Sequence, residues 1–267
     1  MKEKEKEFKI PLWARKALAH LIYEAEDMYK LLHVTKKGIQ HLQRIPRLYE
    51  LLLNPNDPKN PVTEKDIERA REEAAIAQAE AEQDYRRSHQ QFCISIWAHL
   101  ESKIRMLCVG FVANEPHHLQ SEKFRKIKVV ISEYECLSEQ EKAMFLIEQL
   151  ENNVASPLRK GVNRFEDLLA VFGLSGKLEA QVTKNLYELN QVRNLIAHQE
   201  GKVDQRFSDS CPWLNISVGD PLNISTHDIE RYFVSVMTYC KSITQRVAHN
   251  YGVDLEFDTP ADGNIAQ

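Results

Sequence analysis

An arginine, an asparagine and a histidine stand close together in the chain, at Arg193, Asn194 and His198. A guanidinium can hold a phosphate through paired hydrogen bonds, and an imidazole can accept or release a proton near neutral pH. Cleavage of a phosphodiester bond in RNA requires both tasks. This short segment therefore offers the residue types that RNA cleavage needs.

These residues fall near the end of a stretch with the periodicity of an amphipathic helix. At about 100° per residue, Arg193 lies on the apolar face, where a packing residue would be expected. A permanently charged side chain there needs a partner or an opening to solvent. Asn194 and His198 share a neighbouring face, and Gly201 is typical of a helix end. The apolar positions beside Arg193 are Val182, Leu186, Leu189 and Ile196.

The residues alone leave two interpretations of this segment open. In the first, Arg193, Asn194 and His198 act together on a phosphate. In the second, Arg193 extends outward from a packed edge, and His198 caps the C-terminus of the helix, where the helix dipole favours a cation.

The pattern Arg193-Asn194-x-x-x-His198 resembles the Arg-x(4 to 6)-His motif of the HEPN superfamily. That superfamily consists of all-helical domains found in prokaryotic ribonuclease toxins and defence proteins. Residues 92–111 resemble the family's early core helix with an internal acid, here Glu101, and residues 162–249 have the expected order of helices. The resemblance thus covers most of the chain after its N-terminal part.

The resemblance implies a metal-independent endoribonuclease, acting as a toxin or antiphage effector. His198 would be the general base or acid, Arg193 would bind the scissile phosphate, and Asn194 would position either group. Glu101 would hold Arg193 in place, or it is a half-exposed carboxylate near Arg105. The family also implies a homodimer with two facing motifs, and an antitoxin or other defence protein as a further partner. The alternatives are a catalytically inactive HEPN-fold dimeric binding module and a helical scaffold.

Composition and charge limit where RNA can bind. The chain has 267 residues and a formal net charge of -4, so that any contact with RNA must come from a local basic patch. Such bases are otherwise ordinary solvated surface residues. The candidates are Lys123, Lys126, Arg159, Lys160 and Arg164.

The sequence predicts a cytoplasmic protein without a membrane span. The mixed-charge start precedes no apolar run of signal-peptide or transmembrane length. The 5 cysteines are widely spaced, which favours reduced structural thiols. We also expect no cofactor and no metal. Glu115, His117 and His118 invite a metal site, but adjacent side chains are expected to diverge, and a polar loop is the preferred interpretation.

The helical periodicity and the scarcity of glycine predict an all-α fold, a HEPN-like helical bundle with a long N-terminal antiparallel helical hairpin. The first helix begins near Pro11 and is bent or interrupted at Gly38 and Pro46. Residues 64–111 allow one continuous helix of about 70 Å. Its first half carries a seam that suits packing on the preceding helix. The seam comprises Ile67, Ala70, Ala74, Ala77 and Ala81.

Further expectations concern boundaries. A capping residue is expected at Thr63 and at Ser138, and residues 122–134 are expected to form one amphipathic helix. The alternation in residues 213–225 predicts a small β-hairpin insertion. As domains, we expect residues 1–88 to form the hairpin, residues 89–250 the HEPN-like domain and residues 251–267 a flexible acidic tail.

Overall fold

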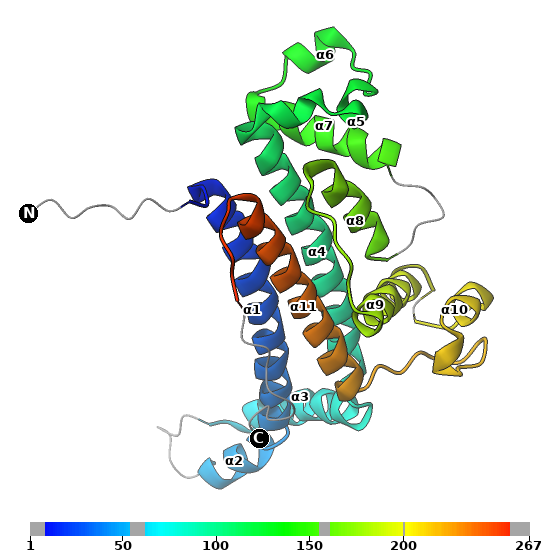
Figure 1. The fold of residues 1–267 in the computed structure, drawn as a ribbon. Helices are drawn as coiled ribbons and strands as arrows, with labels where there is room; N and C mark the ends of the chain where they lie inside the picture. Colours follow the sequence, from blue (N-terminus) through cyan, green and yellow to red (C-terminus); the bar gives the residue numbers. More distant parts are fainter. Residues whose placement is uncertain (1–8, 54–61, 155–160, 200, 257–267) are drawn as a thin grey trace, which may run out of the picture. The chain divides into compact units, whose positions relative to one another are not determined.

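The computed structural model describes residues 9–53, 62–154, 161–199 and 201–256. This part of the chain is built from α-helices joined by short 3-10 turns and loops and contains no β-strand (Figure 1). The predicted all-α fold is therefore confirmed. The α-helices are α1 (Leu12–Leu42), α2 (Ile45–Leu52), α3 (Glu64–Glu82), α4 (Arg86–Asn114), α5 (Glu122–Arg125), α6 (Ile131–Glu135), α7 (Glu139–Val154), α8 (Asn163–Leu169), α9 (Ala180–Gln199), α10 (Gln205–Ser210) and α11 (Thr226–Asn250). The 3-10 turns are η1 (Pro116–Gln120), η2 (Ala170–Phe172) and η3 (Pro212–Leu214).

The chain divides into two compact units, and the boundaries between them fall within α1, α4, α9 and α11. Each unit combines segments from distant parts of the sequence, so that this division differs from the predicted partition at residue 88. Among the described residues, no helix has the combined length and apolar character that a membrane span needs. The first unit comprises Met1–Glu24, Ala98–Asn190 and Val234–Gln267, and the second comprises Ala25–Trp97 and Gln191–Phe233.

The core of the first unit is assembled from aliphatic and aromatic side chains of α4, α7, α8 and α11. Burying each of these large side chains contributes about 1.5–3 kcal/mol. Fully or almost fully buried members include Leu100, Ile104, Leu107, Ile147, Leu150, Leu169 and Val236. At one end of this core, Phe111 stacks on Phe172, with ring centroids 5.5 Å apart, and Trp13 meets Phe111 edge-on at 4.9 Å. These aromatic contacts tie α1, α4 and η2 together.

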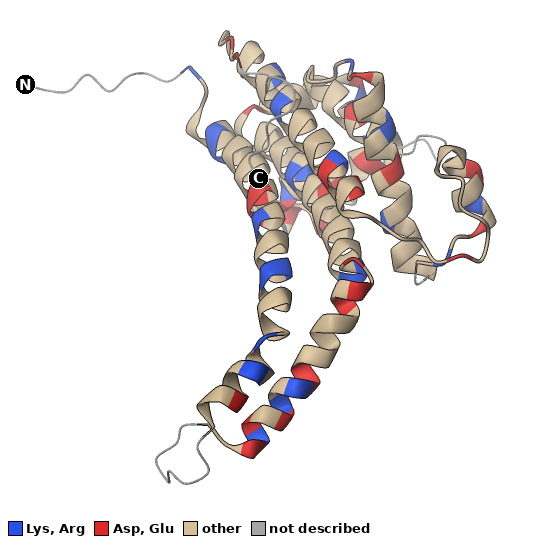
Figure 2. Cartoon of the chain, turned by 90° about the horizontal axis from the view of Figure 1, so that it is seen from below, with Lys and Arg blue, Asp and Glu red and all other residues tan. Residues whose placement is uncertain are grey.

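In the second unit, α2 packs against α3, as the alanine seam predicted. Ile67, Ala70 and Ala77 are buried, whereas Ala74 and Ala81 are half-buried. Polar contacts join α3 to α2 and to the turn that precedes α2. Arg71 pairs with Glu50 at 2.6 Å, and the Gln43 amide donates to the Ala77 carbonyl oxygen at 3.3 Å. Acidic and basic side chains are interspersed along α3, so that its outer face is solvated (Figure 2).

The single continuous helix that residues 64–111 would allow does not form. It is interrupted between α3 and α4, where Asp84 and Tyr85 adopt left-handed conformations with φ of 50° and 56°. Nearby polar groups supply hydrogen-bond partners for the backbone N–H groups at the break. The Tyr85 N–H donates to the Glu80 carbonyl oxygen at 2.8 Å, and the Glu80 carboxylate accepts the Ser88 N–H at 3.0 Å. The absence of proline and glycine from this segment gave no sign of the break.

Other boundaries also differ from expectation. The helix α1 is not interrupted at Gly38 but continues to Leu42, and Pro46 occupies the first turn of α2, a position that suits proline. The expected helix over residues 122–134 is two short helices, α5 and α6, and Ile131 is 73% exposed. The capping residues at Thr63 and Ser138 are confirmed, because each accepts the backbone N–H three residues onward.

The predicted β-hairpin over residues 213–225 is not present. Within the segment, the Asp220 N–H donates to the Ser217 carbonyl oxygen at 3.2 Å, which forms a turn and not a strand pair. Other backbone groups bond to the segment after α9: the Gly219 N–H donates to the Val203 carbonyl oxygen at 2.8 Å, and the Leu222 N–H donates to the Gly201 carbonyl oxygen at 2.8 Å. The 3-10 turn η3 and the left-handed Asn215, with φ of 50°, interrupt the alternating pattern.

Acidification is expected to destabilise the protein through His89. This side chain is fully buried, and its Nδ1–H donates to the Ile224 carbonyl oxygen at 2.7 Å. Burial is the main reason that the pKa of His89 lies below its ordinary value of 6.5. The unfolded chain therefore binds a proton that the folded chain does not. The stabilisation is present above about pH 6.5 and is lost as the pH falls below it, by about 1.4 kcal/mol per unit of pKa difference.

Urea unfolding at about pH 7.5 and about pH 5.5 measures this effect. Asn at position 89 keeps a hydrogen-bond donor but does not titrate, so His89→Asn should lose less stability on acidification than the wild type. The exposed His227 provides the matched control, and His227→Asn should keep the wild-type pH dependence. An unchanged pH dependence in His89→Asn would contradict the assignment.

Candidate functional site

The helix α9 places Arg193 at the end of a buried apolar stripe, as predicted. Val182 is 8% exposed, and Leu186 and Leu189 are fully buried. Arg193 and Ile196 are only half-buried. The stripe thus opens toward solvent at the turn that carries the arginine, which provides the opening that its permanent charge requires.

The end of α9 is defined by Gly201. Its φ of 75° is left-handed, and its N–H donates to the Leu195 carbonyl oxygen at 3.4 Å, a typical helix-terminating arrangement. The positive φ favours glycine, and a Cβ atom at this position would lie 2.8 Å from Nε2 of Gln90 and displace the end of that side chain. The Val203 N–H then donates to Asp220 at 2.9 Å, which fixes the direction of the chain after the helix.

Within the predicted motif, the side chains of Arg193 and Asn194 form a hydrogen bond. Nη1 of Arg193 donates to Oδ1 of Asn194 at 2.9 Å. The bond restrains the guanidinium at one edge and also orients the asparagine amide. Two of the three predicted motif residues therefore form one polar unit.

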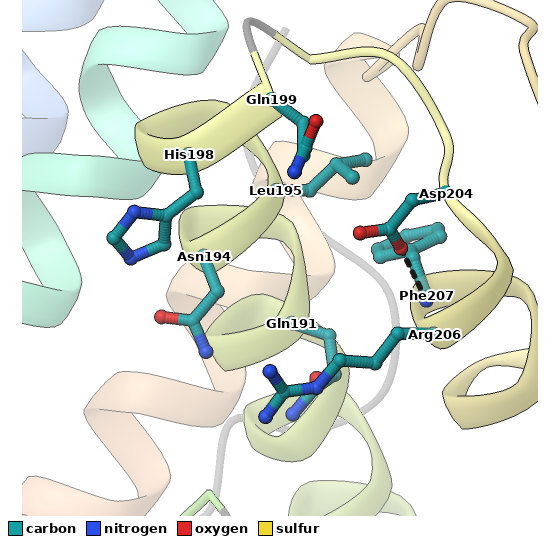
Figure 3. A pocket seen from close by; sticks show the side chains of 8 residues that line it. All are labelled: Gln191, Asn194, Leu195, His198, Gln199, Asp204, Arg206 and Phe207. Atoms are coloured by element: carbon teal, nitrogen blue, oxygen red, sulfur yellow. Dashed lines mark hydrogen bonds between the residues drawn. The ribbon is translucent and has the colours of Figure 1, made fainter.

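Asn194 and His198 line a pocket of about 270 Å³ at the end of α9. Figure 3 shows the His198 ring and the Asn194 amide on the same side of the helix, which follows from their spacing of four residues. His198 is exposed, so its imidazole is accessible to a substrate. The complete lining is Gln191, Asn194, Leu195, His198, Gln199, Asp204, Arg206 and Phe207.

Arg193 is not among the lining residues and contacts the lining through its hydrogen bond to Asn194. The arginine that lines the pocket is Arg206, which was not among the residues predicted from the sequence. It extends from α10 toward Gln191 in Figure 3, and it is exposed. Asp204 caps α10 by accepting the Phe207 N–H at 2.7 Å, and Phe207 is buried at 4% exposure. The cap and this apolar anchor determine which way α10 directs Arg206. The spacing of Asp204 and Phe207 was the available sequence signal, since an Asp before a short apolar turn often starts a helix.

The other candidate residues belong to the first unit. Oε1 of Glu101 lies 4.0 Å from Nη1 of the exposed Arg164, and its role in orienting Arg193 stays a prediction. Lys123 is exposed on α5, and the exposed Lys126 pairs with Glu122 at 2.6 Å. The remaining two candidates, Arg159 and Lys160, lie outside the described residues.

One expectation about metal ligands is wrong. The adjacent side chains of His117 and His118 do not diverge, because their ring centroids lie 4.1 Å apart. Glu115 joins them, and one ligand atom from each of the three residues lies within 4.8 Å of the others. The segment is a 3-10 turn, η1, rather than a polar loop.

No protein-family model matches the chain, and neither does any curated protein or solved structure. The resemblance to the HEPN superfamily therefore depends on the motif in α9 and on the helical character of the fold. The chemistry of the pocket must be argued from its own polar residues, which are an exposed imidazole, three amides, the Asp204 carboxylate and an exposed guanidinium. One of these amides, Asn194, is hydrogen-bonded to Arg193.

Proposed function

We propose that the protein is a metal-independent endoribonuclease of the HEPN type, which acts as a toxin or antiphage-defence effector. The observation that supports this proposal is the arrangement at the end of α9. Asn194, which holds Arg193 at 2.9 Å, lines the same pocket as the exposed His198 and Arg206. A phosphodiester in that pocket would lie next to a proton-transfer group, His198, and a cation, Arg206, while Arg193 is held by the lining residue Asn194.

The proposed reaction is attack by the ribose 2′-hydroxyl on the adjacent phosphorus. A bond forms between the 2′-oxygen and phosphorus, and the bond from phosphorus to the 5′-oxygen of the next nucleotide breaks. His198 takes the 2′-proton as general base, or supplies the proton that the leaving 5′-oxygen needs. The products are a 2′,3′-cyclic phosphate and a 5′-hydroxyl.

The two arginines have different tasks in this proposal. Arg193 binds the scissile phosphate and offsets the charge that develops on its oxygens in the transition state. Its hydrogen bond to Asn194 already restricts the guanidinium, so that less conformational entropy is lost when the phosphate binds. Arg206 is exposed on α10 and attracts a neighbouring phosphate of the RNA backbone, which a chain of net charge -4 cannot do as a whole.

The pocket supplies a single imidazole, whereas the reaction uses a base and an acid. We propose that a second copy of the chain supplies the complementary His198, so that a homodimer is the active form. The two His198 side chains of the dimer then face one shared site, where one acts as the base and the other as the acid. The resemblance to the HEPN superfamily likewise implies a homodimer with two facing motifs.

RNA cleavage in the presence of a chelator is the test of the proposed function. Purified protein is incubated with cellular RNA and EDTA, and the termini of the products are analysed. Cleavage that leaves 2′,3′-cyclic phosphates is the expected result. Circular dichroism in the same buffer serves as the control for folding. A folded protein that cleaves no RNA, or that requires magnesium, would show the proposal to be wrong.

A second candidate function, a binding module or scaffold, is favoured by the apolar surface of the second unit. Large apolar side chains on α1, α2 and α3 are exposed, with Leu31 at 64%, Val34 at 64%, Leu51 at 76% and Ile76 at 68%. Surfaces of this kind are typical of protein interaction sites. A folded dimer without ribonuclease activity in the same assay would support this candidate instead.

A further inference from the structure

A compact group of metal-ligand side chains lies directly after α4, in the first unit. Glu115 follows the last residue of the helix, and its N–H donates to the Phe111 carbonyl oxygen at 2.8 Å. His117 and His118 follow in η1. One donor atom from each of these three residues lies within 4.8 Å of the other two. The group is separate from the α9 motif in sequence and plays no part in the proposed cleavage.

The distance between two of these donors already fits a shared ion. Nε2 of His118 lies 3.5 Å from Oε2 of Glu115. Two ligands at about 2.1 Å from a tetrahedral Zn²⁺ are about 3.4 Å apart. An ion placed between these atoms would therefore need little movement of either side chain.

Neighbouring groups hold both donors in position. The His118 ring meets Phe111 at 5.5 Å and Phe172 at 5.2 Å, both edge-on, and its side chain is only 16% exposed. The Tyr251 hydroxyl donates to Oε1 of Glu115, which leaves Oε2 toward His118.

The third donor is adjustable. His117 is exposed, and its ring centroid lies 4.1 Å from that of His118. Its ligand atom lies within 4.8 Å of those of Glu115 and His118, and a rotation of this exposed side chain would bring the nitrogen into the ligand shell.

We propose that Glu115, His117 and His118 bind one divalent transition-metal ion of the Zn²⁺ class. Two imidazole nitrogens and one carboxylate oxygen suit Zn²⁺, whereas Ca²⁺ and Mg²⁺ prefer oxygen ligands only. Water occupies the fourth position. Tyr251 is a supporting residue that orients the ligating carboxylate, and it links the ion to the chain after α11. The bound ion thus ties the end of α4 to the residues that follow α11.

Calorimetric titration of tag-free, metal-stripped full-length protein with ZnCl₂ tests the site. We expect saturable binding of one ion per chain, and Co²⁺ should give the strong visible absorption of a tetrahedral complex. His117→Ala, at an exposed position that leaves the core intact, should weaken binding by at least about ten-fold, and Tyr251→Phe by about ten-fold or more. The thermal midpoint of the wild type should rise on the order of 5 °C at a Zn²⁺ concentration far above Kd.

The matched control is His249→Ala, which removes a histidine that is 80% exposed and lies 3.4 Å from the Asp254 carboxylate. Its affinity for Zn²⁺ should equal that of the wild type. An absence of saturable binding in the wild type, or equal affinities in His117→Ala and the wild type, would overturn the proposal. RNA cleavage is not the readout, so that this outcome is independent of the proposed ribonuclease activity.

Discussion

Replacing His198 with alanine is expected to slow RNA cleavage by about a hundred- to ten-thousand-fold, because the reaction loses its proton-transfer group. The side chain is exposed at the last turn of α9, so its removal creates no cavity and should leave the stability unchanged. Single-turnover cleavage of a labelled RNA in EDTA measures the rate. His227→Ala, another exposed histidine of the second unit, serves as the control and should cleave at the wild-type rate.

The two arginines allow a sharper version of this experiment. Arg193→Ala should abolish detectable cleavage because it removes the cation at the scissile phosphate. Arg206→Ala should instead weaken RNA binding and reduce its dependence on salt, with a smaller effect on the rate at saturating RNA. Retained cleavage in His198→Ala, or products with 3′-hydroxyl ends, would contradict the mechanism even if the protein is a ribonuclease.

Replacing Glu166 with alanine is expected to lower the free energy of unfolding by about 3–5 kcal/mol, because a charge remains without its partner in a mostly buried site. Nη1 of Arg246 lies 2.8 Å and 2.9 Å from the two carboxylate oxygens of Glu166, and both side chains are 15% exposed. The same nitrogen donates to the Leu174 carbonyl oxygen at 3.1 Å, and the Gly176 N–H donates to Glu166 at 2.7 Å. Loss of the carboxylate therefore affects α8, α11 and the loop between α8 and α9.

Urea unfolding followed by circular dichroism measures this change. The pair of Arg105 and Glu151 is the matched control, because it also has two-point geometry but its arginine is 44% exposed. Glu151→Ala should cost no more than about 1 kcal/mol, since solvent screens the exposed charge. If the two alanine variants lose equal stability, burial of the Glu166 pair does not have the importance assigned to it.

The local features of this protein could be read from its sequence. The half-buried position of Arg193 follows from its place in an apolar stripe, and the shared face of Asn194 and His198 follows from a spacing of four residues. The helix end at Gly201 follows from glycine's tolerance of a positive φ. These properties depend on residues within one or two turns of each other, so that periodicity and capping rules are sufficient to predict them.

Features that depend on contacts between distant segments could not be predicted in this way. The left-handed break at Asp84 and Tyr85 contains neither glycine nor proline, and residues distant in sequence contact it. The Gln40 amide donates to the Tyr85 hydroxyl at 2.9 Å, and the Thr226 hydroxyl donates to the Asp84 carboxylate at 3.5 Å. The segment expected to pair with itself as a β-hairpin bonds instead to the chain after α9, because those N–H and carbonyl groups are the partners that the fold brings within reach.

The same distinction applies to the chemistry of the two sites. The sequence alone determined the Arg193, Asn194 and His198 motif, because a single helix carries all three residues. Only the tertiary structure decided that Arg206 joins the pocket, since the direction of α10 depends on how Phe207 is buried. It also decided that His118 turns toward Glu115, because Phe111 and Phe172 enclose its ring and Tyr251, far along the chain, holds the carboxylate. Packing against distant residues, which no local spacing encodes, selects these side-chain directions.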